Sequence, residues 1–171
     1  MLNVVVDTNI LMRSFAFIEQ LGKIEWVRVV VPRAVYIEIR ERANLELLKQ
    51  LKNQPQNSEL KKQEKTIVLA LKSWPKLKEK VQRQEWMVMK SKNNDVLKEL
   101  RWKARQAQLN SISNTDLKVL AVAISLRNKG SKVKLLTLDR ELAILARRMG
   151  IRVPRWHGSR KYFWRDEILN F

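Results

Sequence analysis

Apolar residues near the N-terminus form short continuous runs, each followed by a helical spacing of apolar positions. Residues 2–6 are almost entirely apolar and end at Asp7, which is the pattern of a buried strand followed by a capped helix. A second apolar run covers residues 26–31 and stops at Pro32. Proline is tolerated in the first turn of a helix, so the pattern predicts a second helix from about Arg33.

The middle of the chain is rich in polar residues, and its apolar residues recur at the spacing of helices. The second helix is predicted to continue to about residue 52, where a polar, proline-containing loop ends it. Residues 58 to about 108 are predicted to be helices rich in Lys, Arg, Gln and Glu, with a break at residues 73–75, Ser-Trp-Pro. The stretch of about 53–109 therefore has the pattern of a helical insertion.

Strand and helix alternate again in the C-terminal part. A helix is predicted from Ser113 to about Gly130, then a strand over residues 132–138, a further helix, and a last short strand over residues 151–153. Alternation at both ends of the chain indicates an α/β fold with a parallel sheet flanked by helices. We expect a single domain, residues 1–171, interrupted by the insertion.

Charge is the strongest compositional signal. The 171 residues include 35 Lys and Arg against 17 Asp and Glu, a net charge of +18, so a polyanion and most simply nucleic acid is the expected partner. A generally basic protein, or one that meets anionic membrane, is the alternative. The chain has no cysteine, no apolar run near the roughly 20 residues needed to span a bilayer, and no signal-peptide pattern, so we expect a cytoplasmic protein with no membrane contact.

Four acidic residues occupy positions that a parallel sheet would bring together. Asp7 and Asp139 directly follow strands, and Glu38 and Asp116 lie in the first turns of helices. Because the carboxyl ends of parallel strands share one edge, these carboxylates are expected to converge. Converging carboxylates repel one another unless cations neutralise them, and their hard oxygen atoms suit Mg²⁺ or Mn²⁺. The alternative is purely structural: helix N-caps, a capping box from Ser113 to Asp116, and a solvated glutamate.

Four segments of the chain carry a family resemblance. Residues 4–11 (VVVDTNIL), 31–39 (VPRAVYIEI), 114–123 (NTDLKVLAVA) and 136–142 (LTLDREL) resemble, in order, the motifs of PIN-domain nucleases. The resemblance covers about residues 1–52 and 110–154. It implies a PIN-like sheet and a metal-dependent endoribonuclease that acts in RNA processing or maturation.

The resemblance also implies a set of site residues. The ligands of one or two Mg²⁺ or Mn²⁺ ions would be Asp7, Glu38, Asp116 and Asp139, with Glu141 as an alternative to Asp139. Supporting or water-binding groups would be Thr8, Asn9 and Thr137.

Several branches of the family remain open. The third segment is most similar to PIN endonucleases that mature small-subunit ribosomal RNA, but this chain lacks the cysteines of their zinc module. Protein-only RNase P-like proteins and VapC-type toxins are the other branches. A non-catalytic RNA-binding or assembly protein on a PIN scaffold is the alternative from another class. RNA is the expected partner, and a second copy of the chain, an antitoxin and a ribosome-assembly partner are left open.

The basic stretch around the insertion is the expected RNA-binding surface. From residue 49 to 109, sixteen Lys and Arg and six Asp and Glu leave a net +10. The RNA-binding residues predicted here are Lys90, Lys92, Arg101, Lys103 and Arg105. The tryptophans Trp74, Trp86 and Trp102 are expected to pack a small core of the insertion rather than stack on bases. The aromatic and basic tail, residues 154–171, is expected to pack over the sheet edge, with RNA binding and a subunit contact as alternatives. Its His157 is not expected to be catalytic.

Overall fold

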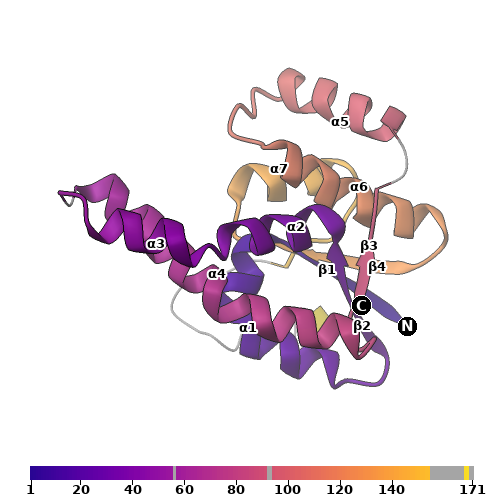
Figure 1. Ribbon diagram of the computed structural model, residues 1–171. Helices are drawn as coiled ribbons and strands as arrows, with labels where there is room; N and C mark the ends of the chain where they lie inside the picture. The colour runs from indigo at the N-terminus through magenta and orange to yellow at the C-terminus, as the bar shows by residue number, and fades with distance from the viewer. Residues whose placement is uncertain (56, 92–93, 155–167, 170–171) are drawn as a thin grey trace.

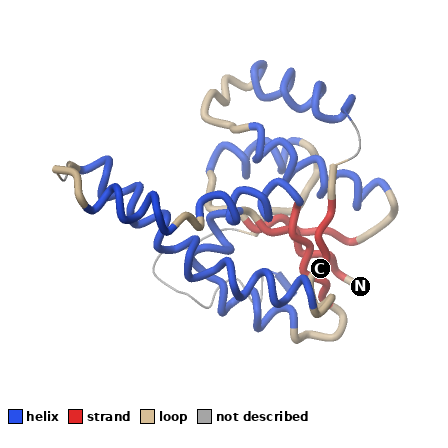
Figure 2. Tube along the Cα trace, viewed as in Figure 1, coloured by secondary structure: helices blue, strands red, loops and turns tan. Residues whose placement is uncertain are grey.

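The sheet is parallel throughout and four strands wide. The computed structural model describes residues 1–55, 57–91, 94–154 and 168–169, which leaves Lys92, His157 and most of the C-terminal tail outside the described residues. Within these, the strands, drawn in red in Figure 2, are β1 (Leu2–Val6), β2 (Val27–Pro32), β3 (Met87–Met89) and β4 (Lys132–Leu136). Their order in the sheet is β3-β2-β1-β4. The helices are α1 (Thr8–Gly22), α2 (Arg33–Arg42), α3 (Leu45–Lys52), α4 (Ser58–Gln82), α5 (Asn94–Gln106), α6 (Asn114–Asn128) and α7 (Arg140–Arg148). The predicted α/β parallel sheet is confirmed.

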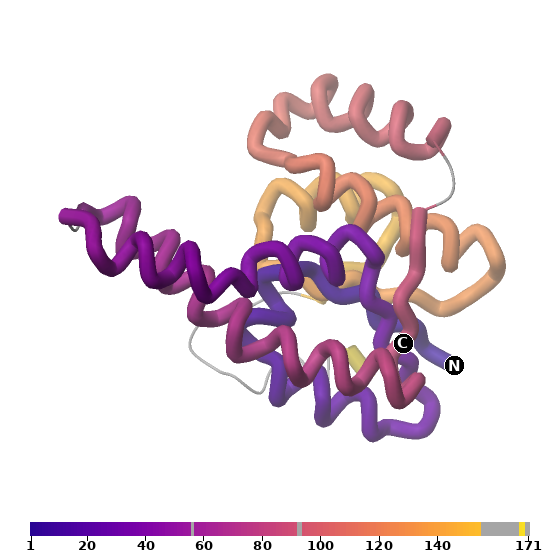
Figure 3. The backbone as a smooth tube through the Cα atoms, in the orientation of Figure 1, coloured from indigo at the N-terminus to yellow at the C-terminus, as the bar shows by residue number. Residues whose placement is uncertain are grey.

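Helices cover both faces of the sheet. Helix α1 packs beside β2, α6 packs over β1 and β4, and α5 lies outside α6 (Figure 1). The central strand β1 is buried along its whole length, as expected for a parallel strand covered on both faces. Its residue Val4 pairs with Val29 of β2 and with Lys134 of β4. The hairpin of α3 and the start of α4 projects from this body (Figure 3).

The predicted helix over residues 33–52 is in fact two helices. Helix α2 ends at Arg42, and α3 starts at Leu45. The Asn44 side chain between them accepts a hydrogen bond from the Leu47 N–H at 3.0 Å. An asparagine at this position satisfies an otherwise unpaired N–H of a new helix, so a second helix starts here.

The predicted break at residues 73–75 is also wrong, because α4 runs through Pro75 without interruption. Tertiary packing holds this part of the helix. Ser73 is buried, and the Trp74 ring meets Tyr36 of α2 edge-on with 5.0 Å between ring centroids. Contacts of this kind offset the backbone hydrogen bond that proline removes.

The insertion is not purely helical. Residues 87–89 form β3, which pairs with β2 in parallel register, Val31 opposite Val88. A three-residue strand is too short to show an alternating pattern of its own. The assignment of residues 53–109 to an insertion stays a prediction. At the other edge, the strand predicted over residues 151–153 is reduced to a single bridge between Lys134 and Arg152.

The tryptophans of this region differ in their surroundings. Trp86 is buried and packs on Phe15 of α1 with 5.0 Å between ring centroids. Trp86 and Trp74 therefore join the main core rather than a separate small core. Trp102 on α5 is 59% exposed, so the expectation of packing is wrong for it. No helix within the described ranges is long and apolar enough to cross a membrane.

Candidate active site at the carboxyl edge of the sheet

Asp7 lies between β1 and α1 and is almost fully buried, with 2% exposure. Its Oδ1 accepts a hydrogen bond from the Thr8 N–H at 2.6 Å, as a helix-capping carboxylate does. Its Oδ2 accepts a second from the Thr137 hydroxyl at 3.0 Å. Thr137 directly follows β4, so the parallel pairing of β1 and β4 brings these two side chains together.

Glu38 reaches the same place from α2. The Thr8 hydroxyl donates to Glu38 Oε2 at 2.6 Å, which links the glutamate to the residue after Asp7. The other carboxylate oxygen of Glu38 is paired with the Arg42 guanidinium one helical turn further on. Arg42 was not among the predicted site residues, although its spacing of four residues from Glu38 is the signal for such a pair.

Asp116 stands in the first turn of α6. Its carboxylate accepts a hydrogen bond from the Ser113 N–H at 2.8 Å, and its own N–H donates to the Ser113 hydroxyl at 3.1 Å. This is the capping box that the sequence suggested. The capping role does not remove Asp116 from the site, because its charge acts on Asp7.

The electrostatics of Asp7 show which acids are gathered. The pKa of Asp7 is raised to about 7, first by burial and second by the negative charge of Asp116. Hydrogen bonds from Thr137 and Thr8 lower this pKa, and the charge of Glu38 raises it. Among the described residues, no lysine or arginine is one of the main causes that shift the pKa of Asp7. A carboxylate with acidic neighbours and no basic partner favours a bound cation.

Asp139 is linked to this cluster through Thr137. Its N–H donates to the Thr137 hydroxyl at 2.9 Å, while its carboxylate caps α7 by accepting from the Leu142 N–H at 2.8 Å. Glu141, the alternative, accepts from the Ser111 N–H at 2.9 Å and so fastens the loop before α6.

The four acids fit a divalent ion by their chemistry, since all are hard oxygen donors. In the part of the chain that the structure describes, no three Asp, Glu or His side chains are grouped closely enough to hold one ion as they stand. The local hydrogen bonds explain this spacing, because each carboxylate is drawn toward a donor on its own element. Ligation by these four residues stays a prediction.

A cleft opens beside the acids. It has a volume of about 990 Å³ and lies between α1, α2 and the projecting hairpin of α3 and α4. Asn9 and Glu38 line its inner end, and Lys62 and Gln63 of α4 line its outer side. Asn9 therefore faces the cleft beside Glu38, and its role as a supporting or water-binding group stays a prediction.

The predicted RNA-binding residues lie on and before α5. Lys90 is exposed just after β3, and Arg105 is exposed in the last turn of α5. The Arg101 guanidinium donates to Asn114 Oδ1 at 2.9 Å, at the start of the helix that carries Asp116. Lys103 is paired with Glu99 at 2.8 Å.

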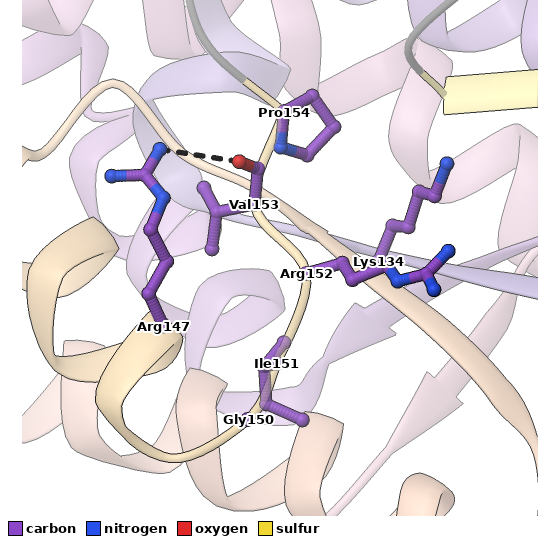
Figure 4. A pocket seen from close by; sticks show the side chains of 7 residues that line it. All are labelled: Lys134, Arg147, Gly150, Ile151, Arg152, Val153 and Pro154. Carbon is purple, nitrogen blue, oxygen red and sulfur yellow. Dashed lines mark hydrogen bonds between the residues drawn. The ribbon is translucent and has the colours of Figure 1, made fainter. Parts of the chain in front are cut away.

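A separate cavity of about 500 Å³ lies beside the segment that follows α7 (Figure 4). It is basic, but two of its cations hold backbone. Arg147 donates to the Val153 carbonyl at 3.1 Å, and the buried Lys134 ammonium donates to the Ile168 carbonyl at 3.0 Å. These cations fix the C-terminal segment and are not part of the acidic site.

The family follows from the sequence as a whole. The model of the PIN domain family matches residues 4–157, which include all four acids and the strands that present them. The chain belongs to the PIN domain family. PIN domains are commonly metal-dependent ribonucleases, so membership of the family suggests a nuclease. The branch of the family is not decided by the match.

Solved structures resemble this PIN domain in fold. A domain of a functionally unknown protein from Methanocaldococcus jannaschii DSM 2661 has a TM-score of 0.53 and 20% identity, with 93% of this chain and 94% of that one covered. VapBC2 from Rickettsia felis, solved with a DNA fragment from its promoter, has a TM-score of 0.48 and 14% identity, with 92% and 100% covered. No curated protein matches the sequence.

Proposed function

We propose that this PIN domain is a Mg²⁺- or Mn²⁺-dependent endoribonuclease that hydrolyses RNA phosphodiester bonds in RNA processing or maturation. One observation carries the proposal. Asp7 is buried at the carboxyl edge of the sheet, and its pKa is raised both by burial and by the charges of Asp116 and Glu38. A buried, ionised Asp7 beside two other carboxylates destabilises the fold unless a cation offsets the negative charge. In this family such a cation commonly serves hydrolysis.

The proposed roles follow from the contacts. Asp7, Glu38, Asp116 and Asp139 would hold the ion or ions, which when bound supply an activated water and neutralise charge on the phosphate. Thr8 donates to Glu38 and Thr137 donates to Asp7, so the two hydroxyls fix the direction of the carboxylate oxygens. The net charge of +18 would hold the RNA backbone, with the exposed cations of α5 closest to the α6 start.

The first test is cleavage of a pool of end-labelled structured RNA with Mn²⁺, with Mg²⁺ and with EDTA. Asp7→Asn is compared with Glu25→Gln, because Glu25 is an exposed acid that precedes β2, at the opposite edge of the sheet. We expect discrete products that need metal, persist in Glu25→Gln and disappear in Asp7→Asn. Equal cleavage by both variants would contradict the proposed site.

A second candidate is an RNA-binding protein without catalysis. It is favoured by the local hydrogen bonds of the acids, since Asp116 and Asp139 already serve as caps. Calorimetric titration with Mn²⁺ separates the two candidates. Binding that is lost in Asp7→Asn supports the nuclease, and an absence of binding together with salt-sensitive RNA affinity supports the RNA-binding protein.

A further inference from the structure

A second cavity lies at the same edge of the sheet as the acids. It has a volume of about 340 Å³ and is formed by the ends of β2 and β3, the starts of α2 and α5, and one side of α6. Its lining residues are Pro32, Arg33, Ala34, Ile37, Met89, Lys90, Ser91, Asn94, Leu97, Lys118 and Val122. The volume is at the lower end of the range of small-ligand pockets.

The cavity combines an apolar wall with a basic rim. Ile37, Met89, Leu97 and Val122 supply apolar surface from four different elements. Arg33, Lys90 and Lys118 supply three positive charges, and none of the described residues that line the cavity is acidic. Ser91 and Asn94 add hydroxyl and amide groups at the β3–α5 connection.

The three cations of the rim are not used by the fold. The ion pairs formed among the described residues involve other lysines and arginines, and none involves Arg33, Lys90 or Lys118. All three are exposed and come from separate segments that folding brings together. Like charges gathered in this way repel one another, and an anion between them offsets that repulsion.

The cavity adjoins the acidic site through two helices. On α2, Ile37 lines the cavity, and the next residue is Glu38. On α6, Lys118 follows Asp116 by two residues, so their Cα atoms are about 5–6 Å apart in a helix. The two sites therefore share α2 and α6, and both lie at the carboxyl edge of the sheet, so one nucleic-acid strand can reach both.

We propose that this cavity holds one unpaired nucleotide of the RNA strand, with its phosphate at Arg33, Lys90 and Lys118 and its base against the apolar wall. The inference rests on the proposed function and adds to it a binding pocket for one nucleotide outside the acidic site. A base inside a duplex is stacked and paired, so it is not free to enter such a pocket. The pocket thus selects for an unpaired nucleotide next to the cleaved bond.

Lys118→Ala tests the rim, with Lys129→Ala as its matched control. Lys129 is an exposed lysine that follows the same helix at its other end. Affinity for a short single-stranded RNA is measured by fluorescence anisotropy in EDTA at several salt concentrations. We expect Lys118→Ala to weaken binding several-fold and to reduce the slope of log Kd against log salt by about 0.7, the value for one phosphate contact on a single strand. Lys129→Ala should leave both quantities unchanged. Equal behaviour of the two variants would overturn the inference.

A modified RNA locates the phosphate. One methylphosphonate linkage, which is neutral, is moved along the strand, and each RNA is measured with the wild-type chain and with Lys118→Ala. We expect one position at which the neutral linkage weakens wild-type binding but no longer weakens binding by Lys118→Ala. The same loss at every position, or equal affinity for a duplex, would contradict a pocket for one unpaired nucleotide.

The alternative occupant is a second copy of the chain. Sedimentation of wild type and Lys118→Ala tests it, because a dimer lost in the variant without a change in RNA affinity would overturn the proposal. All binding is measured without divalent metal, so the result does not depend on cleavage. The pocket and the nuclease are therefore tested separately. A protein without cleavage activity can still show the expected RNA binding by the pocket, and an active nuclease can lack it.

Discussion

At the scale of single residues, the site is organised around the two oxygens of Asp7. One oxygen is held by a backbone N–H next to it and the other by a hydroxyl from a distant strand. The position of Asp7 after an apolar strand, and the residue type, were enough to predict its place at the edge. The raised pKa was not predictable, because it depends on burial and on Asp116 and Glu38, which only the folded chain brings near.

The stability of the metal-free protein should fall as pH rises. Asp7 has a pKa of about 7 in the folded state and near 4 in the unfolded state. Its contribution to the stability of the folded state is therefore fully present below pH 4 and is lost as pH rises through 7. A difference of one unit between the folded and unfolded pKa values corresponds to about 1.4 kcal/mol. The free energy of unfolding of Asp7→Asn should therefore rise by at most about 4 kcal/mol relative to that of wild type between pH 4 and 8. Urea unfolding in EDTA at several pH values measures this difference, with Glu25→Gln as the control. Parallel pH profiles of wild type and Asp7→Asn would contradict it.

Metal binding should release a proton from the same residue. At pH 6 most of Asp7 is protonated in the metal-free chain, and a carboxylate must lose its proton to bind a cation. We expect release of about one proton per Mn²⁺ bound at pH 6 and close to none at pH 8.5. Calorimetric titration in two buffers of different ionisation enthalpy gives the number directly. Release that does not change with pH would mean that Asp7 is not a ligand.

At the scale of elements, the sequence predicted the strands and helices around the sheet and missed those fixed by tertiary contacts. The runs that became β1, β2 and β4 are continuous and apolar, so their patterns are clear. The strand β3 has only three residues, and α4 continues through Pro75 because Trp74 packs on Tyr36. The break between α2 and α3 depends on the N-cap by Asn44. In a polar stretch of sequence, this asparagine cannot be told from an ordinary residue on a helix surface.

Two tryptophans of the same region should respond differently to truncation. Trp86→Ala removes a buried ring that contacts Phe15, and we expect it to cost about 3 kcal/mol or more in the free energy of unfolding. Trp102→Ala removes a ring that is 59% exposed, and we expect a change within about 0.5 kcal/mol. Urea denaturation of the two variants makes the comparison. A large loss for Trp102→Ala would show that α5 is packed more firmly than its exposure indicates.

At the scale of the whole molecule, charge and topology together shape the proposed substrate surface. The chain carries a net charge of +18, yet Asp116 and Glu38 lie near enough to Asp7 at one edge of the sheet for their negative charges to raise its pKa. The parallel alternation of strands predicted this convergence from acids that are far apart in sequence. It did not predict that capping bonds would draw the carboxylates toward their own elements, since hydrogen-bond geometry is set by the folded backbone.

RNA affinity should depend steeply on salt, and the cations of α5 should account for part of that dependence. Replacing Arg101, Lys103 and Arg105 by Ala is expected to lower the slope of log Kd against log salt by about 2, from three phosphate contacts on a single strand. A triple variant of Lys61, Lys65 and Lys72 on α4 is the matched control for net charge. Equal slopes for the two triple variants would mean that α5 binds RNA only through overall charge.

The hydrogen bond between Thr137 and Asp7 joins residues that are 130 positions apart in the chain. On the ribosome, Asp7 is made early, and β4 with Thr137 emerges only after the helices between them. Until then, Asp7 lacks the Thr137 hydroxyl that holds one of its two oxygens, and the edge of the sheet near Asp116 is incomplete. The acidic site is therefore assembled only after β4 and Thr137 have been made. A growing chain that has not reached Thr137 carries Asp7 without the hydrogen bond that completes its surroundings.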